Sequence, residues 1–152
     1  MNKPYDVIDK PFITEYSVLQ NNKAVHQLST NDKGVYNFKI RIGIGQLMYS
    51  EAFQKLHIDL TLANLRSNST ESPHPLSEGR EANIPPEEKT SFIFEADYSI
   101  PRQKVLDNLA EYLRITVFIL TESLKDGLYR PASLLDTALF FKDSEEDNGT
   151  GR

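Results

Sequence analysis

Apolar and polar residues alternate strictly in three stretches of the chain. The clearest is VYNFKIRIGIG, residues 35–45, in which every second residue is a large apolar one. The same alternation recurs over 56–62 and over 92–100, and a weaker form of it covers 12–19. A repeat of two residues is typical of a β-strand with one buried and one wet side. We therefore predict four strands, with 36–45 and 56–62 paired as a hairpin.

After Pro101 the spacing of apolar residues changes from two to about 3.6, the period of a helix. Pro101 suits a first helical turn, and Gly127 is a plausible left-handed end. The pattern predicts one long helix between these residues and a short second helix over 131–141. The apolar stripe consists of Val105, Leu109, Tyr112, Leu113, Thr116 and Leu120. The expected fold is α+β: a four-stranded antiparallel sheet with a long C-terminal helix and a short helix packed on one face.

The middle of the predicted helix, residues 115–120, is apolar or β-branched at every position, and read alone it could also be a buried strand. As a helix it would be apolar on the side that faces away from the sheet. That side requires a cover, which a second copy of the chain could supply. We therefore predict a homo-oligomer, a dimer or a tetramer, with Ile115, Phe118, Ile119 and Glu122 at the interface.

Residues 12–141 are expected to form a single domain, because 152 residues suffice for one core and hardly for two. The segment 66–89 is rich in Pro, Ser, Asn and Glu and predicts a long mobile loop. Residues 1–11 are expected to be a flexible N-terminus, and 142–152 a disordered acidic tail.

Composition narrows the possible partners. The formal net charge is -5, which disfavours binding along a phosphate backbone, so we expect no nucleic-acid partner. No stretch approaches the roughly 20 apolar residues of a membrane-spanning helix, so we expect no membrane insertion. The absence of cysteine and of an apolar leader suits the cytoplasm.

Catalytic patterns are weak, and we expect neither an enzyme nor a cofactor or metal. His26, His57 and His74 are not spaced as ligands of one metal ion, and no serine lies in a nucleophile-elbow motif. The GIG of 43–45 lacks the third glycine of a dinucleotide-binding loop. Its glycines fall on the polar side of a strand, where they could permit a bulge, a bend or the close approach of another backbone.

Large rings exceed what a small sheet with one helix needs in its core. They could simply make a Phe-rich core, or some could line an oligomer interface or a groove for apolar peptide. The candidate peptide-binding residues are Tyr36, Phe38, Phe53, Phe92, Phe94 and Tyr98.

The C-terminal third, LAEYLRITVFILTESLKDGLYRPASLLDTALFF, resembles the SecB export-chaperone family. The resemblance extends over about residues 12 to 141 and is strongest at Gly127, Tyr129, Pro131 and the closing Leu/Phe segment. It departs from the family in the length of the 66–89 segment. The resemblance implies an oligomer, often a tetramer, that binds non-native, extended polypeptide without ATP and serves protein export or a toxin–antitoxin system.

We accordingly expect a holding chaperone or polypeptide-binding module whose partner is unfolded or extended polypeptide. The alternative is a non-enzymatic adaptor or assembly protein that binds one specific folded partner. In that case the segment 66–89 and the acidic tail would be the recognition elements.

Overall fold

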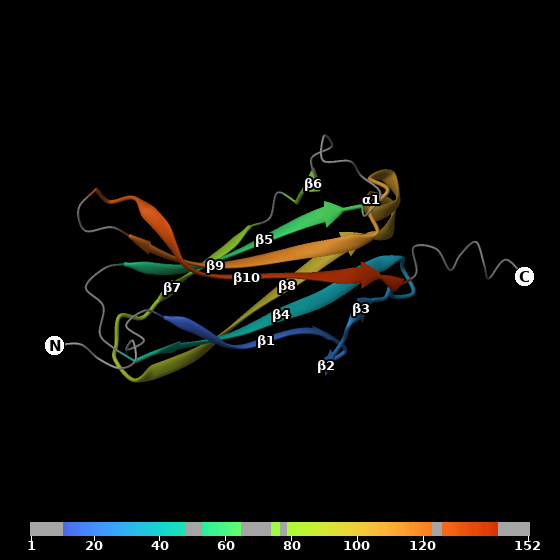
Figure 1. Cartoon of the computed structure of the whole chain (residues 1–152). Coiled ribbons are helices and arrows are strands. Elements are labelled where there is room, and N and C mark those ends of the chain that lie inside the picture. Colours follow the sequence, from blue (N-terminus) through green and yellow to red (C-terminus); the bar gives the residue numbers. More distant parts are fainter. Residues whose placement is uncertain (1–10, 48–52, 65–73, 77–78, 123–125, 143–152) are drawn as a thin grey trace, which may run out of the picture.

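The computed structural model describes residues 11–47, 53–64, 74–76, 79–122 and 126–142. The predictions of a flexible N-terminus and a disordered acidic tail fall outside these ranges, except for Pro11 and Lys142. Figure 1 shows two layers of strands that run along the length of the molecule, with the helix α1 at one end.

The described elements form two sheets and one short helix. Sheet A has four strands in the order β2-β1-β4-β8, and sheet B has β3-β10-β9-β5-β6, with β7 also pairing β5. Their bounds in chain order are β1 (Phe12–Gln20), β2 (Lys23–Ala24), β3 (Gln27–Leu28), β4 (Val35–Gln46), β5 (Gln54–Ala63), β6 (His74–Pro75), β7 (Arg80–Ile84), β8 (Thr90–Pro101), α1 (Arg102–Asp107), β9 (Tyr112–Glu122) and β10 (Tyr129–Phe141).

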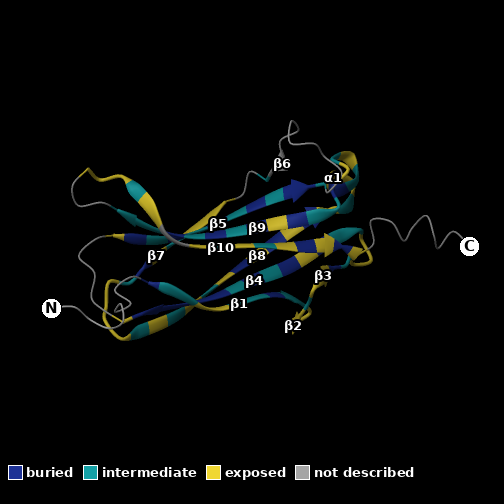
Figure 2. Cartoon of the chain, in the orientation of Figure 1, coloured by how far each residue is buried: buried dark blue, intermediate teal, exposed yellow. Residues whose placement is uncertain are grey.

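The hydrophobic core lies between the two sheets, because each long strand turns alternate residues inward. In β4 the even-numbered residues from Tyr36 to Ile44 are buried, and in β5 those from Leu56 to Leu62. In β9 the odd-numbered residues from Leu113 to Ile119 meet them from sheet B. The alternation of buried and exposed residues is visible along the strands in Figure 2.

The four predicted strands are confirmed as β1, β4, β5 and β8, but the predicted pairing is wrong. β4 pairs with β1 and β8 in sheet A, whereas β5 pairs with β9 and β7 in sheet B. The strands 36–45 and 56–62 therefore belong to different sheets and form no hairpin. Alternation shows that a strand has two different sides, but it does not say which strand lies beside it.

The predicted α+β fold with a long C-terminal helix is wrong, because the described fold is a sandwich of two β-sheets. The helix α1 ends at Asp107, and residues 112–122 of the proposed helix form β9, a central strand between β10 and β5. The predicted short second helix is β10, and Gly127, with φ of 70°, lies in the β9–β10 connection.

The physical reason is that residues 115–120 satisfy both periods. Ile115, Val117 and Ile119 share the inner side of a strand, and their outer neighbours are also mostly apolar, so a helical stripe can be traced through the same residues. The run is dense in β-branched residues, which lose side-chain freedom in a helix and pack well in a pleated sheet. Pairing with β10 on one side and β5 on the other then favours the strand.

The two glycines of the GIG segment accommodate a β-bulge, one of the alternatives that the sequence left open. The register of β1 on β4 shifts between Ile13, which pairs with Ile44, and Glu15, which pairs with Gly43, while Gly45 pairs with the preceding Phe12. A Cβ on Gly43 would lie 2.7 Å from the Thr14 hydroxyl, and one on Gly45 would lie 3.0 Å from the Phe12 ring. A side chain at either position would press on β1 beside its bulge, and glycine avoids this contact.

The segment 66–89, expected to be one long loop, contains two strands within its described residues, the two-residue β6 and the longer β7. Residues 80–84 form β7, which pairs with β5 from Gln54↔Ile84 to Ile58↔Arg80. Ile84 is buried in the core, which gives this polar segment an anchor. β7 thereby lies at the edge of sheet B, on the same side of the sandwich as β8.

Candidate functional site

The free edge of β8 is the most distinctive surface feature of the sandwich. β8 is a 12-residue strand at the end of sheet A, and within the described ranges only β4 pairs with it. The β4–β8 register runs without interruption from Val35↔Pro101 to Gln46↔Thr90. The opposite edge of β8 therefore offers a long, regular row of backbone groups.

Two hydrogen bonds show which backbone groups of β8 point outward. The Arg102 N–H donates to the Gly34 carbonyl across the ladder, so the even-numbered residues of β8 face β4. The Asp97 carbonyl instead accepts from the Arg80 side chain, away from β4. Because both groups of one residue point to the same side, the outward groups belong to Ser91, Ile93, Glu95, Asp97 and Ser99.

The other long edges of the sandwich are interrupted. β1 carries the bulge between Ile13 and Glu15. β10 contains Pro131, and its register on β9 shifts between Pro131 and Ser133. Bulges and prolines are common devices that prevent an edge from pairing with another chain. β8 has neither device within its length, since its only proline is the terminal Pro101.

The described contact that covers part of the β8 edge comes from β7. Arg80 Nη2 donates to the Asp97 carbonyl at 3.1 Å, and the guanidinium lies 5.1 Å from the centre of the Tyr98 ring. This exposed side chain spans the open side of the sandwich from sheet B to sheet A. It occupies one outward acceptor of β8, the Asp97 carbonyl.

The outer side of sheet A beside this edge carries a chain of surface ion pairs. Arg41 contacts Glu15 at 3.1 Å and Glu95 at 3.2 Å, and Lys39 lies 3.7 Å from Glu95. These pairs are half exposed and contribute little to stability individually. Charged residues on an edge strand such as Glu95 and Asp97 oppose indiscriminate pairing with apolar strands.

A small cavity adjoins one end of the β8 edge. Its volume is about 160 Å³, and it opens between the two sheets close to α1. The Leu76 N–H donates to the Leu60 carbonyl at 2.9 Å, which holds the Leu76 side of the cavity against β5. The lining is mainly apolar and consists of Leu60, Leu76, Tyr98, Ser99, Ile100, Pro101 and Lys104.

The predicted peptide-binding residues gather on sheet A, apart from Phe53, but most of their rings are internal. Tyr36, Phe38 and Tyr98 are buried in the core, where the Phe38 and Tyr98 rings stack at 5.4 Å. Phe92 and Phe94 lie on the inner side of β8 and are half-buried. These five rings therefore belong to the core or pack against it, and Tyr98 also lines the cavity.

Phe53 stands apart from this group. It precedes β5, its exposed fraction is 74%, and its carbonyl accepts a hydrogen bond from the Glu122 N–H. The predicted peptide-binding set is therefore not one continuous lining.

The predicted interface residues are divided between the two sides of β9. Ile115 and Ile119 are fully buried between the sheets, so a partner cannot reach them in this fold. Phe118 is on the outer side of sheet B, half-buried beside the ring of His57, and Glu122 ends the strand. Leu134, opposite Phe118 on β10, is 58% exposed and extends this apolar outer patch.

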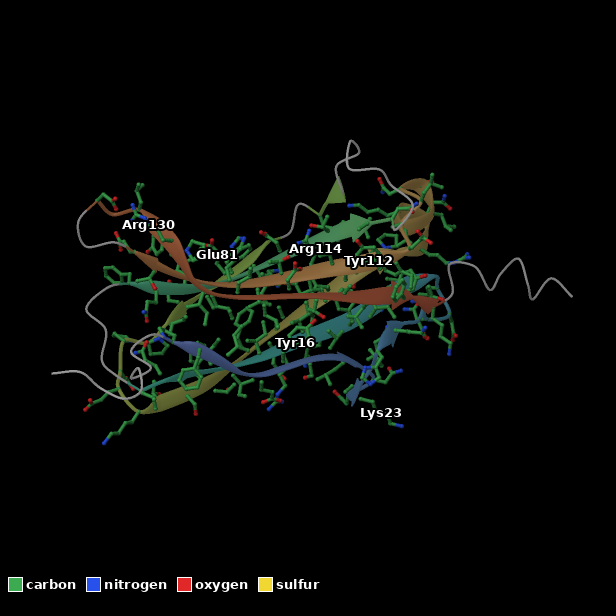
Figure 3. The ribbon with its side chains drawn as sticks, in the orientation of Figure 1. Tyr16, Lys23, Glu81, Tyr112, Arg114 and Arg130 are labelled. Atoms are coloured by element: carbon green, nitrogen blue, oxygen red, sulfur yellow. The ribbon has the colours of Figure 1, made fainter. Side chains whose placement is uncertain are left out.

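Polar clusters on the outer side of sheet B have structural explanations. His57 lies between two carboxylates, with Nδ1 2.9 Å from Glu81 and Nε2 2.7 Å from Asp59. These carboxylates approach opposite ring nitrogens, so they do not converge on one point, and no group of metal-binding side chains occurs among the described residues. His57 instead ties β7 to β5, and Figure 3 shows Glu81 on the outer side of this sheet.

Arg114 and Asp136 form the most strongly perturbed ion pair. Arg114 donates two hydrogen bonds to the carboxylate, one of them 2.9 Å long. These bonds hold the pKa of Asp136 below its usual range and raise the pKa of Arg114. Both side chains are exposed on the outer side of sheet B, so the pair links β9 to β10 across a solvated surface.

A second cavity, of about 240 Å³, lies on the opposite side of the sandwich between β1 and β10. Tyr16 lines it from sheet A, and Figure 3 shows this residue between the two layers. Burial raises the pKa of Tyr16 to about 12, and the neighbouring Thr137 hydroxyl offsets part of that rise. The phenol is thus neutral at physiological pH and has no evident part in acid–base chemistry.

Sequence reasoning missed Arg80, Leu76 and Lys104, which complete the β8 edge and its cavity. Arg80 and Leu76 lie in the segment expected to be a loop, and Lys104 lies in the proposed long helix. The one available signal was the strict alternation of 92–100, which predicts a regular strand but not its position at an edge.

Comparison with known proteins does not assign a family. No family model matches the chain, and no curated protein matches its sequence. Among solved structures, one described as the X-ray structure of Northeast Structural Genomics Consortium target SoR45 is similar at a TM-score of 0.41 and 13% identity. The match covers 88% of this chain and 86% of that chain. Similarity at this level supports no argument about fold or activity. Within the described ranges, no helix is long and apolar enough to cross a membrane.

Proposed function

We propose that this chain binds extended segments of other polypeptides by adding them as a further strand at the free edge of β8. The observation that carries the proposal is the row of outward backbone groups from Ser91 to Ser99, in which the Asp97 carbonyl accepts from Arg80. Strand addition of this kind takes its affinity from main-chain hydrogen bonds and its selectivity from the side chains around the edge. It requires no nucleotide and no cofactor.

Such an edge suits a holding chaperone. An unfolded client offers backbone groups whatever its sequence, and the half-buried Phe92 and Phe94 rings add apolar contact on the inner side of β8. Burial of apolar client surface contributes about 25 cal/mol per Å² before ordering costs are subtracted. The function implied by the SecB resemblance is thus proposed here on a different structural ground, an edge strand in place of a groove lined by aromatic side chains.

The cytoplasm is the compartment that we propose, since a chain without cysteine suits a reducing environment. A role in protein export or beside a toxin–antitoxin system stays a prediction from the resemblance. The same holds for the predicted homo-oligomer.

The decisive test replaces Ile93 by proline. Its N–H points away from β4, so Ile93→Pro removes one outward donor and leaves the β4–β8 ladder intact. We expect the variant to fold but to bind a fluorescent strand-forming peptide at least about tenfold more weakly, a loss of about 1.4 kcal/mol. Suppression of aggregation of an unfolded client at near-stoichiometric ratio should fall in parallel.

Ile93→Ala is the matched control, because it removes the same exposed side chain and keeps the backbone donor. It should bind the peptide as the unsubstituted chain does. Equal binding by all three proteins would show that the β8 edge is not the binding site. No peptide binding at micromolar concentration and no suppression of aggregation would overturn the proposed function itself.

An adaptor that binds one folded partner is the second candidate. The exposed apolar patch of Phe118 and Leu134 on the outer side of sheet B is the observation in its favour, because folded partners bind flat apolar patches. A pull-down from lysate separates the candidates: many unfolded clients support the first, and one stoichiometric partner supports the second. Phe118→Asp should abolish binding of the single stoichiometric partner and leave binding of unfolded clients unchanged.

A further inference from the structure

We infer that the cavity beside β8 is a socket for one apolar side chain of the added strand, and that it sets the register of that strand. This inference rests on the proposed function. It goes further, because it states which residue type a bound segment needs and where the segment needs it.

Strand geometry places the side chain at the socket. Residues directly opposite one another in neighbouring strands point to the same side of the sheet. Tyr98 and Ile100 turn inward from β8 and are buried. A residue of the added strand opposite either of them therefore also points between the sheets. That is where the cavity opens, with Leu60 of β5 on its far side.

The size of the cavity fits a side chain better than a free ligand. Its volume is about 160 Å³. Sites for whole small molecules usually measure about 300–1,000 Å³, so this cavity is too small for most of them. One aliphatic side chain attached to a strand on β8 would fill it without any further anchor.

The lining specifies an uncharged, apolar side chain. Leu60, Leu76 and Ile100 supply aliphatic surface, and Pro101 adds a ring without a backbone donor. Lys104 lines the cavity and is an exposed residue, and the methylene stem of such a lysine can add to an apolar wall. Its positive charge disfavours a lysine or arginine in the socket.

The test uses fluorescent peptides that differ only in one central residue. Each is a Thr/Ser-rich strand former that carries Leu, Ala or Lys at one central position and is otherwise identical. We expect the unsubstituted protein to bind the Leu peptide about tenfold more tightly than the Ala peptide, and the Lys peptide no better than the Ala peptide. The tenfold ratio corresponds to about 1.4 kcal/mol.

Leu76→Trp should fill the socket and bring the Leu-to-Ala ratio close to one, while the Ala peptide still binds through the backbone. Leu128→Trp is the matched control, since Leu128 is 59% exposed in the β9–β10 connection and distant from the cavity in sequence and sheet position. It should leave the ratio unchanged. Circular dichroism and thermal melting of both variants test whether they are folded.

The outcomes distinguish failure of the proposed strand addition from failure of the socket alone. If no peptide binds the unsubstituted protein, the proposed function fails and the socket with it. If all peptides bind equally, strand addition stands and the socket is overturned. If Leu76→Trp keeps the Leu-to-Ala ratio, the cavity plays no part in selection, which contradicts the inference. If Leu76→Trp changes only the native mass of the protein, the cavity accommodates a second copy of the chain, which also contradicts it.

Discussion

Arg80 is the residue on which access to the β8 edge depends most directly. Its guanidinium crosses from sheet B to sheet A and donates to the Asp97 carbonyl, an acceptor that an added strand would also use. An incoming segment must displace this contact, which is exposed and is reinforced by the Tyr98 ring. Under the proposed function, Arg80 would therefore compete with an added strand for the Asp97 carbonyl.

Arg80→Ala should bind the strand-forming peptide about fivefold more tightly, since breaking one solvent-exposed hydrogen bond costs about 1 kcal/mol. Fluorescence anisotropy titration measures the change. Arg130→Ala serves as the control, because Arg130 is also exposed and pairs with Asp126 outside the β8 edge. Weaker binding by Arg80→Ala would mean that the guanidinium contacts the bound segment and does not compete with it.

At the scale of the element, β9 is the segment in which the helix predicted from the sequence and the strand found in the structure differ. As a strand it buries Ile119 completely and leaves Phe118 half-buried on the outer side. As a helix, neighbouring residues 118 and 119 would lie about 100° apart on the same apolar surface. The strand therefore predicts very different costs for truncating two adjacent apolar residues.

Ile119→Ala should lower the free energy of unfolding by about 2–4 kcal/mol, because it leaves a cavity in the core. Phe118→Ala should cost less than about 1.5 kcal/mol, because an outer-side ring loses little burial. Urea unfolding of both variants at one pH gives the comparison. Similar losses for the two substitutions would contradict the alternation of β9.

How far the sequence predicted the fold follows from these elements. β4 and β8 were predictable, because each has one apolar and one polar side and so satisfies only the period of a strand. β9 was not, because apolar residues on both sides satisfy two periods at once, and the error spread from it to the fold class. The edge position of β8 depends on pairing with β4 from a distant part of the chain, which local pattern does not encode.

The candidate site was predictable only in part, and for the same reason. The alternation of 92–100 gave the right strand and included Tyr98, but it selected the inner rings as binding residues. Arg80 and Leu76 could not be selected, since they reach β8 only after β7 and Leu76 pack beside β5. Their segment is polar and proline-rich, and a buried anchor such as Ile84 is a weak signal within it.

At the scale of the whole molecule, the native mass bears on whether two copies of the chain associate, and through which surface. The net charge of -5 and the acidic Glu95 and Asp97 oppose antiparallel pairing of two β8 strands, because that pairing can bring like charges opposite one another. If the predicted dimer or tetramer forms, the outer patch at Phe118 and Leu134 is therefore the expected contact.

Sedimentation velocity of three proteins resolves this prediction. Phe118→Asp should reduce an oligomer to the monomer mass, since a carboxylate buried without a partner destabilises an interface by several kcal/mol. Ile93→Pro should leave the oligomer unchanged. The reverse result would place the contact between copies at β8, and a monomeric unsubstituted chain would remove the predicted oligomer altogether.

The order of the strands along the chain has one more consequence. Between β4 and β9 the successive long strands alternate between the layers: β4 belongs to sheet A, β5 to sheet B, β8 to sheet A and β9 to sheet B. A fragment that ends at residue 64 would hold β4 without β8 and β5 without β9, and the complementary fragment would hold their missing neighbours. Neither piece contains a complete layer, so the chain cannot be divided there into parts that fold alone, although two such fragments retain every contact needed to reassemble the sandwich.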